Sequence, residues 1–181
     1  VYIATNSGLV LFNVDYESEE RIDFRYYGQG TNPKNAITKG DIHHILHTSS
    51  GTYLSTAGGG INYVKEWDPE GFPLSFGTYT RKDGLASDNI VSILEASDGY
   101  LWVFGEESLT RFDPDRKSFK TFNDVSKLIH PGLFQEGAST LTRSQKILQG
   151  SSEGVFSFEP LKIPSNSFVP QIMFTKLRLF N

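Results

Sequence analysis

The stretch DNIVSILEASDGYLWV at residues 88–103 decides the fold of this chain. Nearly the same pattern stands 48 residues earlier (88 − 40 = 48), as GDIHHILHTSSGTYLS at residues 40–55. Each copy predicts a strand, a tight turn and a second strand, because short apolar runs flank Ser, Asp and Gly residues. A third predicted strand follows each pair, at residues 109–114 in the later copy and 61–64 in the earlier one. Such self-similarity indicates one supersecondary unit that is repeated along the chain.

Two further copies are found by register. Equivalent strands are predicted to begin at Val1, Tyr53, Leu101 and Ile147, which are 52, 48 and 46 residues apart (53 − 1, 101 − 53, 147 − 101). Eight residues after each start comes an apolar residue, at Leu9, Ile61, Leu109 and Val155. A small residue precedes each of these, at Gly8, Gly60, Ser108 and Gly154. A period in the high forties that is built from short strands favours the four-stranded blade of a β-propeller.

The predicted fold class is therefore all-β: a β-propeller fragment of about four blades of antiparallel four-stranded sheets. Blade repeats start near residues 1, 41, 89 and 137, and the strands of one blade are named A to D in chain order. The chain begins within a strand B, so the first blade is expected to be incomplete and the chain to be a fragment of a larger protein. We expect the partial propeller to span residues 1–168 and an exit segment to span residues 169–181.

Composition narrows the function classes. Aromatic residues make up 13% of the chain, and the net charge is −4 without a basic stripe, which disfavours nucleic-acid binding. No apolar run approaches the roughly 20 residues that a membrane-spanning helix needs, and no signal-peptide pattern opens the chain. The absence of cysteine excludes disulfides and thiolate metal sites and leaves the cellular compartment open.

The sequence resembles a known family at two places. GLASDNIVSILE at 84–95, DGYLWV at 98–103 and LTRFDP at 109–114 are similar to the two-component regulator propeller repeat. GVFSFEP at 154–160 and VPQIMFTKLRLFN at 169–181 resemble the last blade of such a propeller and its exit. The resemblance implies the C-terminal blades of the second propeller in the periplasmic sensor region of a hybrid two-component histidine kinase. The exit would then lead toward an immunoglobulin-like triple-tyrosine domain.

What the resemblance implies about function is a sensory role on the periplasmic side of a bacterial inner-membrane protein. Such a sensor would recognise an oligosaccharide derived from a glycan and would control glycan-utilisation genes through a downstream kinase. The fragment itself would be no enzyme and would need no cofactor. Its partners would be the remaining blades, the second propeller and a second copy in a homodimer or other self-associated species, without nucleic-acid or membrane contact. Two alternatives stay open: a propeller enzyme that acts on glycans as a lyase or hydrolase, and a structural dimerisation module.

Residues that could carry chemistry mostly have a structural explanation. His43, His44 and His47 suggest a metal site, but they lie on a predicted strand A, where about 3.3 Å per residue puts the outer two about 13 Å apart. Glycine-rich residues 57–61 align with a turn between strands B and C. Trp102 sits between apolar neighbours and is expected in the core. Trp67 and Phe72, in an insertion at 67–73, could form either an exposed contact or a local cap over the blade.

The candidate ligand site lies on the turns at one end of the blades. In a propeller the D–A and B–C turns share one end and the A–B and C–D turns share the other. The first set carries charged and amide side chains that suit hydrogen bonding to sugar hydroxyls, whereas the second set is short. Asp41 and Asp88 have an alternative role, capping the turn into strand A. The predicted ligand-binding residues are Lys39, Asp41, Asp88, Asn89, Glu106 and Glu107.

Overall fold

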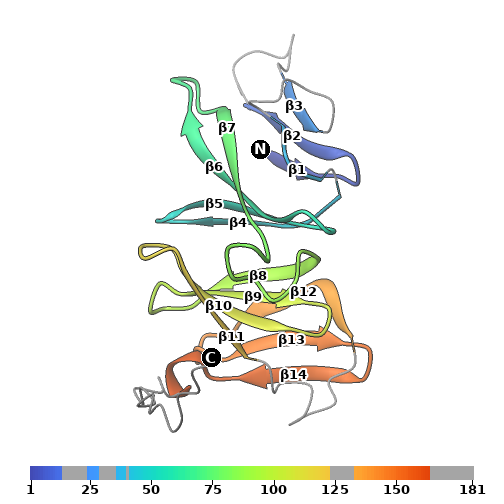
Figure 1. Ribbon diagram of the computed structural model, residues 1–181, viewed down its shortest axis with the longest axis vertical. Coiled ribbons are helices and arrows are strands. Elements are labelled where there is room, and N and C mark those ends of the chain that lie inside the picture. Colours follow the sequence, from blue (N-terminus) through green and yellow to red (C-terminus); the bar gives the residue numbers. More distant parts are fainter. Residues whose placement is uncertain (14–23, 29–35, 40, 123–132, 164–181) are drawn as a thin grey trace, which may run out of the picture.

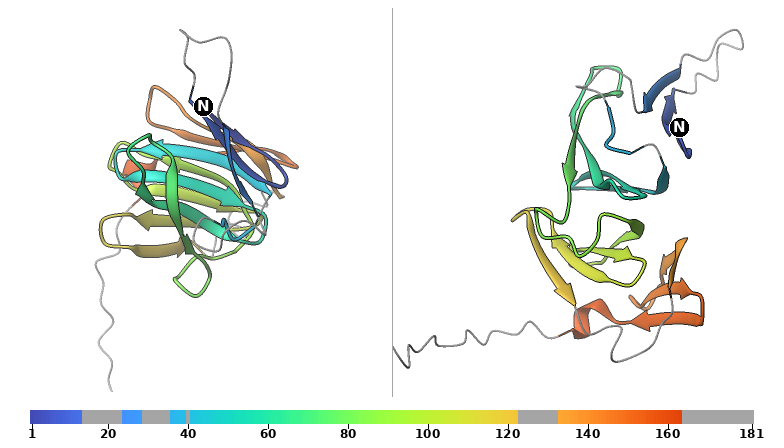
Figure 2. Two further views of the ribbon diagram at one scale, coloured as in Figure 1. Left: turned by 90° about the horizontal axis from the view of Figure 1, so that it is seen from above. Right: turned by 45° about the vertical axis from the view of Figure 1, so that its right-hand side comes forward.

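Four antiparallel sheets follow one another along an open arc in the computed structural model (Figures 1 and 2). The structure describes residues 1–13, 24–28, 36–39, 41–122 and 133–163. Within these residues, the helical structure is one 3₁₀ turn, η1 (Pro160–Lys162), and all other regular elements are strands. The all-β propeller-blade prediction is confirmed.

The sheets have the strand order that the repeat predicts, each strand pairing with its neighbour in sequence. The first sheet contains β1 (Tyr2–Ala4), β2 (Gly8–Phe12) and β3 (Phe24–Gly28). The second contains β4 (Ile42–Thr48), β5 (Gly51–Thr56), β6 (Gly60–Trp67) and β7 (Pro73–Tyr79). The third contains β8 (Ile90–Glu95), β9 (Leu101–Gly105), β10 (Leu109–Asp113) and β11 (Ser118–Phe122). The fourth contains β12 (Phe134–Leu141), β13 (Ile147–Ser151) and β14 (Gly154–Phe158).

The two end sheets differ from the inner pair among the described residues. The first sheet has strands B, C and D, as the predicted start within a blade requires, and the fourth has A, B and C. Strand β12 begins at Phe134, whereas the sequence pattern predicts that the repeat starts near residue 137. A bulge between Phe134 and Ser139 interrupts the pairing with β13. Because a bulge breaks the alternation of side chains, the sequence pattern does not indicate that the strand starts this early. The exit segment predicted for 169–181 lies outside the described residues.

The hydrophobic core lies between the sheets. Side chains on both faces of the third sheet are buried, because one face packs against the second sheet and the other against the fourth. Val103 and Phe112 cluster with Tyr53 and Ile61 of the second sheet. On the other face, Trp102 is fully buried in a cluster that includes Ile147 and Phe156 of the fourth sheet, so its predicted core position is confirmed.

The register of the second unit differs by one residue from the prediction. Leu46 pairs with Tyr53 where the third unit pairs Leu94 with Trp102, so Tyr53 is equivalent to Trp102 and not to Leu101. Both rings accordingly face the next sheet. The A–B turn of the second unit is one residue shorter than that of the third, and its B–C turn is one residue longer. These changes cancel, so the sequence period is kept while strand B shifts.

A close approach of strand D explains the small residue that precedes strand C. A Cβ atom on Gly8 would lie 2.3 Å from the backbone oxygen of Tyr27, and one on Gly60 would lie 2.0 Å from that of Tyr79. Gly154 has nothing within 4 Å of such an atom, in a sheet without a described strand D. Glycine is therefore a packing requirement at Gly8 and Gly60, whereas the third sheet, which also has a strand D, carries Ser108 at this place.

Candidate functional site

Backbone hydrogen bonds tie neighbouring sheets together at the end that carries the D–A and B–C turns. The N–H of Ile42 donates to the carbonyl oxygen of Thr5 at 3.1 Å, across the first and second sheets. The N–H of Gly60 donates to the oxygen of Asp88 at 2.7 Å, and that of Phe134 donates to the oxygen of Glu106 at 2.8 Å. Each pair joins a B–C turn to the start of strand A in the next sheet. The turns at this end therefore have fixed positions relative to one another.

Four of the six predicted ligand residues are exposed on this end. Lys39, Asp41, Glu106 and Glu107 are exposed, and the side chains of Glu106 and Glu107 make no hydrogen bond or ion pair with the described residues. The aliphatic stem of Lys39 passes beside the B–C turn, since a Cβ atom on Gly59 would lie 2.7 Å from its Cγ. The structure thus brings Lys39 to the turn of its own sheet, while Glu106 and Glu107 lie on the turn of the next.

Asp88 and Asn89 are half-buried and belong to the framework of the D–A loop. A carboxylate oxygen of Asp88 accepts from the N–H of Arg81 at 2.7 Å, which is the turn-capping role left open for it. The backbone N–H of Asn89 donates to the hydroxyl of Ser87 at 3.0 Å. The side-chain oxygen of Asn89 is buried and has no hydrogen-bond partner in the described structure. Asn89 therefore keeps one unused acceptor at this end.

His43 joins three sheets beside Asp41, an arrangement that the sequence did not reveal. Its side chain is 4% exposed, and its Nδ1 lies 2.9 Å from the carbonyl oxygen of Ile90, so Nδ1 donates. Its Nε2 lies 3.4 Å from a carboxylate oxygen of Glu136 and 4.0 Å from one of Asp41. The Asp41 carboxylate therefore faces an imidazole. The sequence pattern places His43 on a strand A as a structural residue, and it does not show which residue of another sheet lies next to it.

The other two histidines of strand β4 have separate surroundings. Burial lowers the pKa of His44, whose Nδ1 lies 3.4 Å from the backbone nitrogen of Ile93. Burial also lowers the pKa of His47, whose ring packs edge-on against Tyr2 with the ring centres 4.4 Å apart. Among the described residues, no group of three or more His, Asp or Glu side chains is arranged to hold a metal ion.

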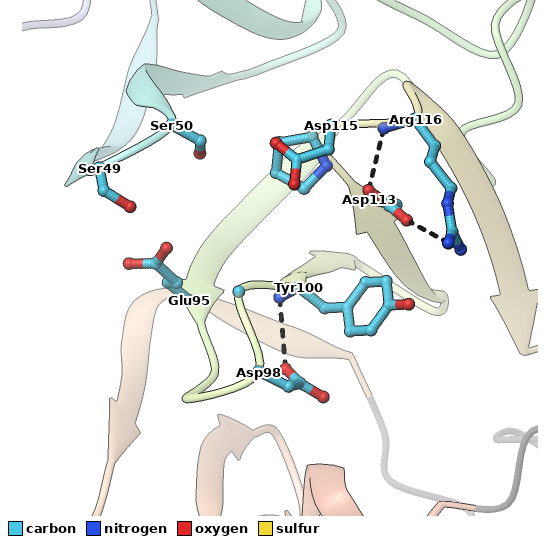
Figure 3. Close-up of a pocket in the computed structure, with 10 residues that line it drawn as sticks. Ser49, Ser50, Glu95, Asp98, Tyr100, Asp113, Asp115 and Arg116 are labelled. Atoms are coloured by element: carbon cyan, nitrogen blue, oxygen red, sulfur yellow. Dashed lines mark hydrogen bonds and ion pairs between the residues drawn. The ribbon is translucent and has the colours of Figure 1, made fainter.

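A cavity lies at the opposite end, between the A–B turns of the second and third sheets and the C–D turn of the third. Its volume is about 280 Å³, and its lining includes Ser50, Glu95, Asp98, Asp113 and Asp115 (Figure 3). Two of these carboxylates stabilise turns, since Asp98 accepts from the N–H of Tyr100 and Asp113 from that of Arg116. Glu95 and Asp115 accept no hydrogen bond within the described residues, and burial raises the pKa of Glu95. The sequence pattern predicts only that the turns at this end are short.

The insertion at 67–73 caps the first interface. Phe72 is 6% exposed in the cluster between the first and second sheets, and the guanidinium of Arg25 lies over its ring at 4.1 Å. Arg25 also forms an ion pair with Asp68 and a second one with Glu70 at 2.7 Å. Phe72 is thus part of a local cap, which was one of the two predicted roles. Trp67 remains 40% exposed.

The fold and its stacked sheets define the class of the protein as a β-propeller, and comparisons with known proteins refine that class. Residues 84–107 match the family described as two component regulator propeller. The resemblance to two-component regulator propeller repeats is therefore confirmed, on the stretch that carries strands β8 and β9.

Solved structures share the fold over most of the chain. The extracellular domain assigned to the hybrid two-component system BT3049 of B. thetaiotaomicron is 17% identical, with a TM-score of 0.58 over 88% of this chain. The corresponding domain of BT4673 from the same organism is 16% identical, with a TM-score of 0.50 over 89% of this chain. This chain covers only 26% and 28% of those two structures.

A curated protein gives a weaker match. Histidine kinase P4 of Formosa agariphila is 24% identical over 99 residues, which are 55% of this chain and 7% of that protein. The chain thus spans a small part of each relative. Within the described residues, no helix is long and apolar enough to cross a membrane.

Proposed function

We propose that this chain is part of the extracytoplasmic sensor region of a hybrid two-component histidine kinase, on the periplasmic side of a bacterial inner membrane. The match of residues 84–107 to the two component regulator propeller family carries the proposal. The shared fold with two domains from hybrid two-component systems supports it. The kinase reaction belongs outside this chain, whose role is to bind a signal or to transmit its binding.

The signal that the exposed turns suit best is an oligosaccharide derived from a glycan. Lys39 offers ammonium donors, and Asp41, Glu106 and Glu107 offer carboxylate acceptors, which together match the hydroxyl groups of a sugar. Because backbone hydrogen bonds fix the turns, the side chains start from defined positions, and binding loses less conformational entropy. Asp88 and Asn89 hold the loop through hydrogen bonds to Arg81 and Ser87.

In this proposal the downstream kinase controls genes for glycan utilisation. The remaining blades of the propeller and the second propeller of the parent chain complete the ligand-binding region. These further parts are included in the proposal because this chain spans only about a quarter of the solved structures that share its fold.

The test is a panel of oligosaccharides titrated into the intact sensor in membrane vesicles. Calorimetry measures binding to the extracytoplasmic region, and radiolabelled phosphate measures autophosphorylation of the kinase. The proposal predicts that at least one oligosaccharide binds and changes the autophosphorylation rate, while its monosaccharides in mixture do not. Binding without any change in phosphorylation, or no binding across the panel, would contradict a sensory role for sugars.

A further inference from the structure

Three cationic side chains converge on the outer part of the third sheet, away from the turns considered above. Arg111 on β10 lies directly opposite Lys120 on β11, and Arg116 lies in the turn that joins these strands. They surround a depression of about 110 Å³. Its lining residues are Tyr100, Arg111, Asp113, Arg116, Ser118, Phe119 and Lys120.

The described side chains around the depression leave most of this positive charge unpaired. Two like charges directly opposite each other on an antiparallel pair repel, and neither Arg111 nor Lys120 makes an ion pair with any described residue. Asp113 supplies the one carboxylate of the depression. It accepts from the N–H of Arg116 at 3.0 Å and lies 3.8 Å from a guanidinium nitrogen of the same residue. Within the described residues, two of the three positive charges therefore have no counter-charge.

An aromatic ring holds the central guanidinium in place. The Arg111 guanidinium lies over the ring of Tyr100, 4.3 Å from its centre. A guanidinium stacked by its face keeps its N–H groups at the edges, where they can donate two parallel hydrogen bonds to an oxyanion. The ring thus orients the guanidinium before any ligand arrives. Ser118 adds a hydroxyl whose side chain has no hydrogen bond in the described structure.

The repeat does not require cations at these positions. The pair equivalent to Arg111 and Lys120 in the second sheet is Tyr63 and Gly77, because Tyr53 and Trp102 are equivalent. There the Tyr63 ring fills the space that the missing side chain of Gly77 leaves, since a Cβ atom on Gly77 would lie 2.2 Å from it. A blade therefore packs well without charge at this place. In the first sheet the equivalent pair is Leu11 and Arg25, so a cation stands on strand D there as well, and the third sheet differs in having a cation on both strands.

We propose that this depression is an oxyanion-binding site for one carboxylate or sulfate group. Arg111 binds the group through two N–H donors, and Lys120 and Ser118 bind it from the facing strand. The neighbouring cavity bears Glu95, Asp98 and Asp115 and limits the ligand to a single anionic group, because a polyanion extending toward it would meet these carboxylates. The site is distinct from the exposed turns of the proposed function and does not depend on them.

The test is an NMR titration of the ¹⁵N-labelled full chain at constant ionic strength, at a concentration at which light scattering shows a monomer. The probes are inorganic sulfate, D-glucose 6-sulfate and D-glucuronate, with D-glucose as the uncharged comparison. The anions are expected to cause saturable shifts of the Ser118 and Lys120 amide signals, and glucose none. Equal affinity for sulfate and glucose 6-sulfate would show that the site recognises the oxyanion alone. Tighter binding of the sugar anions would show that the site also contacts the sugar. Both results support the site.

Two double variants separate this site from general charge effects. Arg111→Gln with Lys120→Gln is expected to weaken anion binding at least about tenfold. Lys65→Gln with Arg143→Gln removes the same net charge at exposed positions on other sheets and is expected to leave the affinity within about twofold. Amide spectra with native dispersion show that each variant is folded. Equal affinities in the two double variants, or no saturable shift in the unchanged chain, would overturn the proposal.

Discussion

At the scale of single residues, the space next to the backbone decides which positions require glycine. At Gly8 and Gly60, the first residues of β2 and β6, a backbone carbonyl oxygen of strand D occupies the place that a side chain would need. Gly58, two residues earlier, has a positive φ as well, but open space around it. The small residue is visible in the sequence at each repeat. The reason for glycine at two of these positions is visible only in the structure, which shows where strand D lies.

The pair Gly60 and Gly58 therefore gives a matched test. Gly60→Ala should lower the free energy of unfolding by at least about 3 kcal/mol, because its Cβ atom would lie 2.0 Å from the Tyr79 oxygen. Gly58→Ala should lower it by about 1 kcal/mol, from its φ of +75° alone. Urea denaturation followed by tryptophan fluorescence measures both. Similar losses in the two variants would show that the close approach is absent.

A second residue-scale prediction concerns pH. Because burial lowers the pKa of His44, the unfolded chain binds more protons than the folded chain below the ordinary histidine pKa of about 6.5. The free energy of unfolding should then fall as the pH falls from 7 toward 5. Replacing His44 by Gln should reduce this slope, and also replacing His47 should reduce it further. Denaturant titrations at several pH values measure the slope, and an unchanged slope in His44→Gln would refute the assignment.

At the scale of elements, short strands and their order could be predicted from the sequence, but registers and contacts between sheets could not. The predicted third unit matches β8 to β11 within one residue, because its turns and alternation agree. The second unit shifts strand B by one residue through two compensating turns, which leave the period of 48 residues unchanged. The order of strands in a blade was enough to predict that the six candidate ligand residues lie on turns. The contact between His43 and Glu136 arises instead from packing between sheets.

Hydrogen bonds between B–C turns and strands A should be visible in amide exchange. The N–H groups of Ile42, Gly60 and Phe134 donate across adjacent sheets, so we expect their exchange to be slowed as strongly as that of strand residues. Ser97, in an exposed A–B turn, should exchange fast. Exchange measured by NMR decides the point: if the three amides exchange as fast as Ser97, the sheets are not tied at this end.

At the scale of the whole molecule, the outer face of the first sheet carries exposed apolar side chains and packs against no other described sheet. Alternation along β1 and β3 puts Val1, Ile3, Phe24 and Tyr26 on that face, where they are 53%, 44%, 68% and 42% exposed. The equivalent face of the second sheet packs against the first sheet through Leu54. The first sheet therefore presents a blade interface to solvent.

Such a surface should cause the isolated chain to self-associate at tens of micromolar, about the concentration range in which exposed apolar surface drives association. Ile3→Ser with Phe24→Ser should reduce the mass measured by light scattering toward that of a monomer. Val155→Ser, at the 70% exposed position on the far side of the fourth sheet, is the control and should change it little. If the chain without substitutions is a monomer at this concentration, the prediction that this face causes self-association is wrong.

The most direct measurement of the central claim is ligand affinity of the intact sensor after substitution at each end of the blades. One variant combines Lys39→Ala, Glu106→Ala and Glu107→Ala, all on exposed turns whose backbone is tied between sheets. The comparison variant combines Asp98→Ala and Asp115→Ala at the opposite end. With an oligosaccharide that activates the sensor, calorimetry should show at least about a tenfold loss of affinity in the first variant and little change in the second. Unchanged affinity in the first variant would show that these turns are not the ligand site.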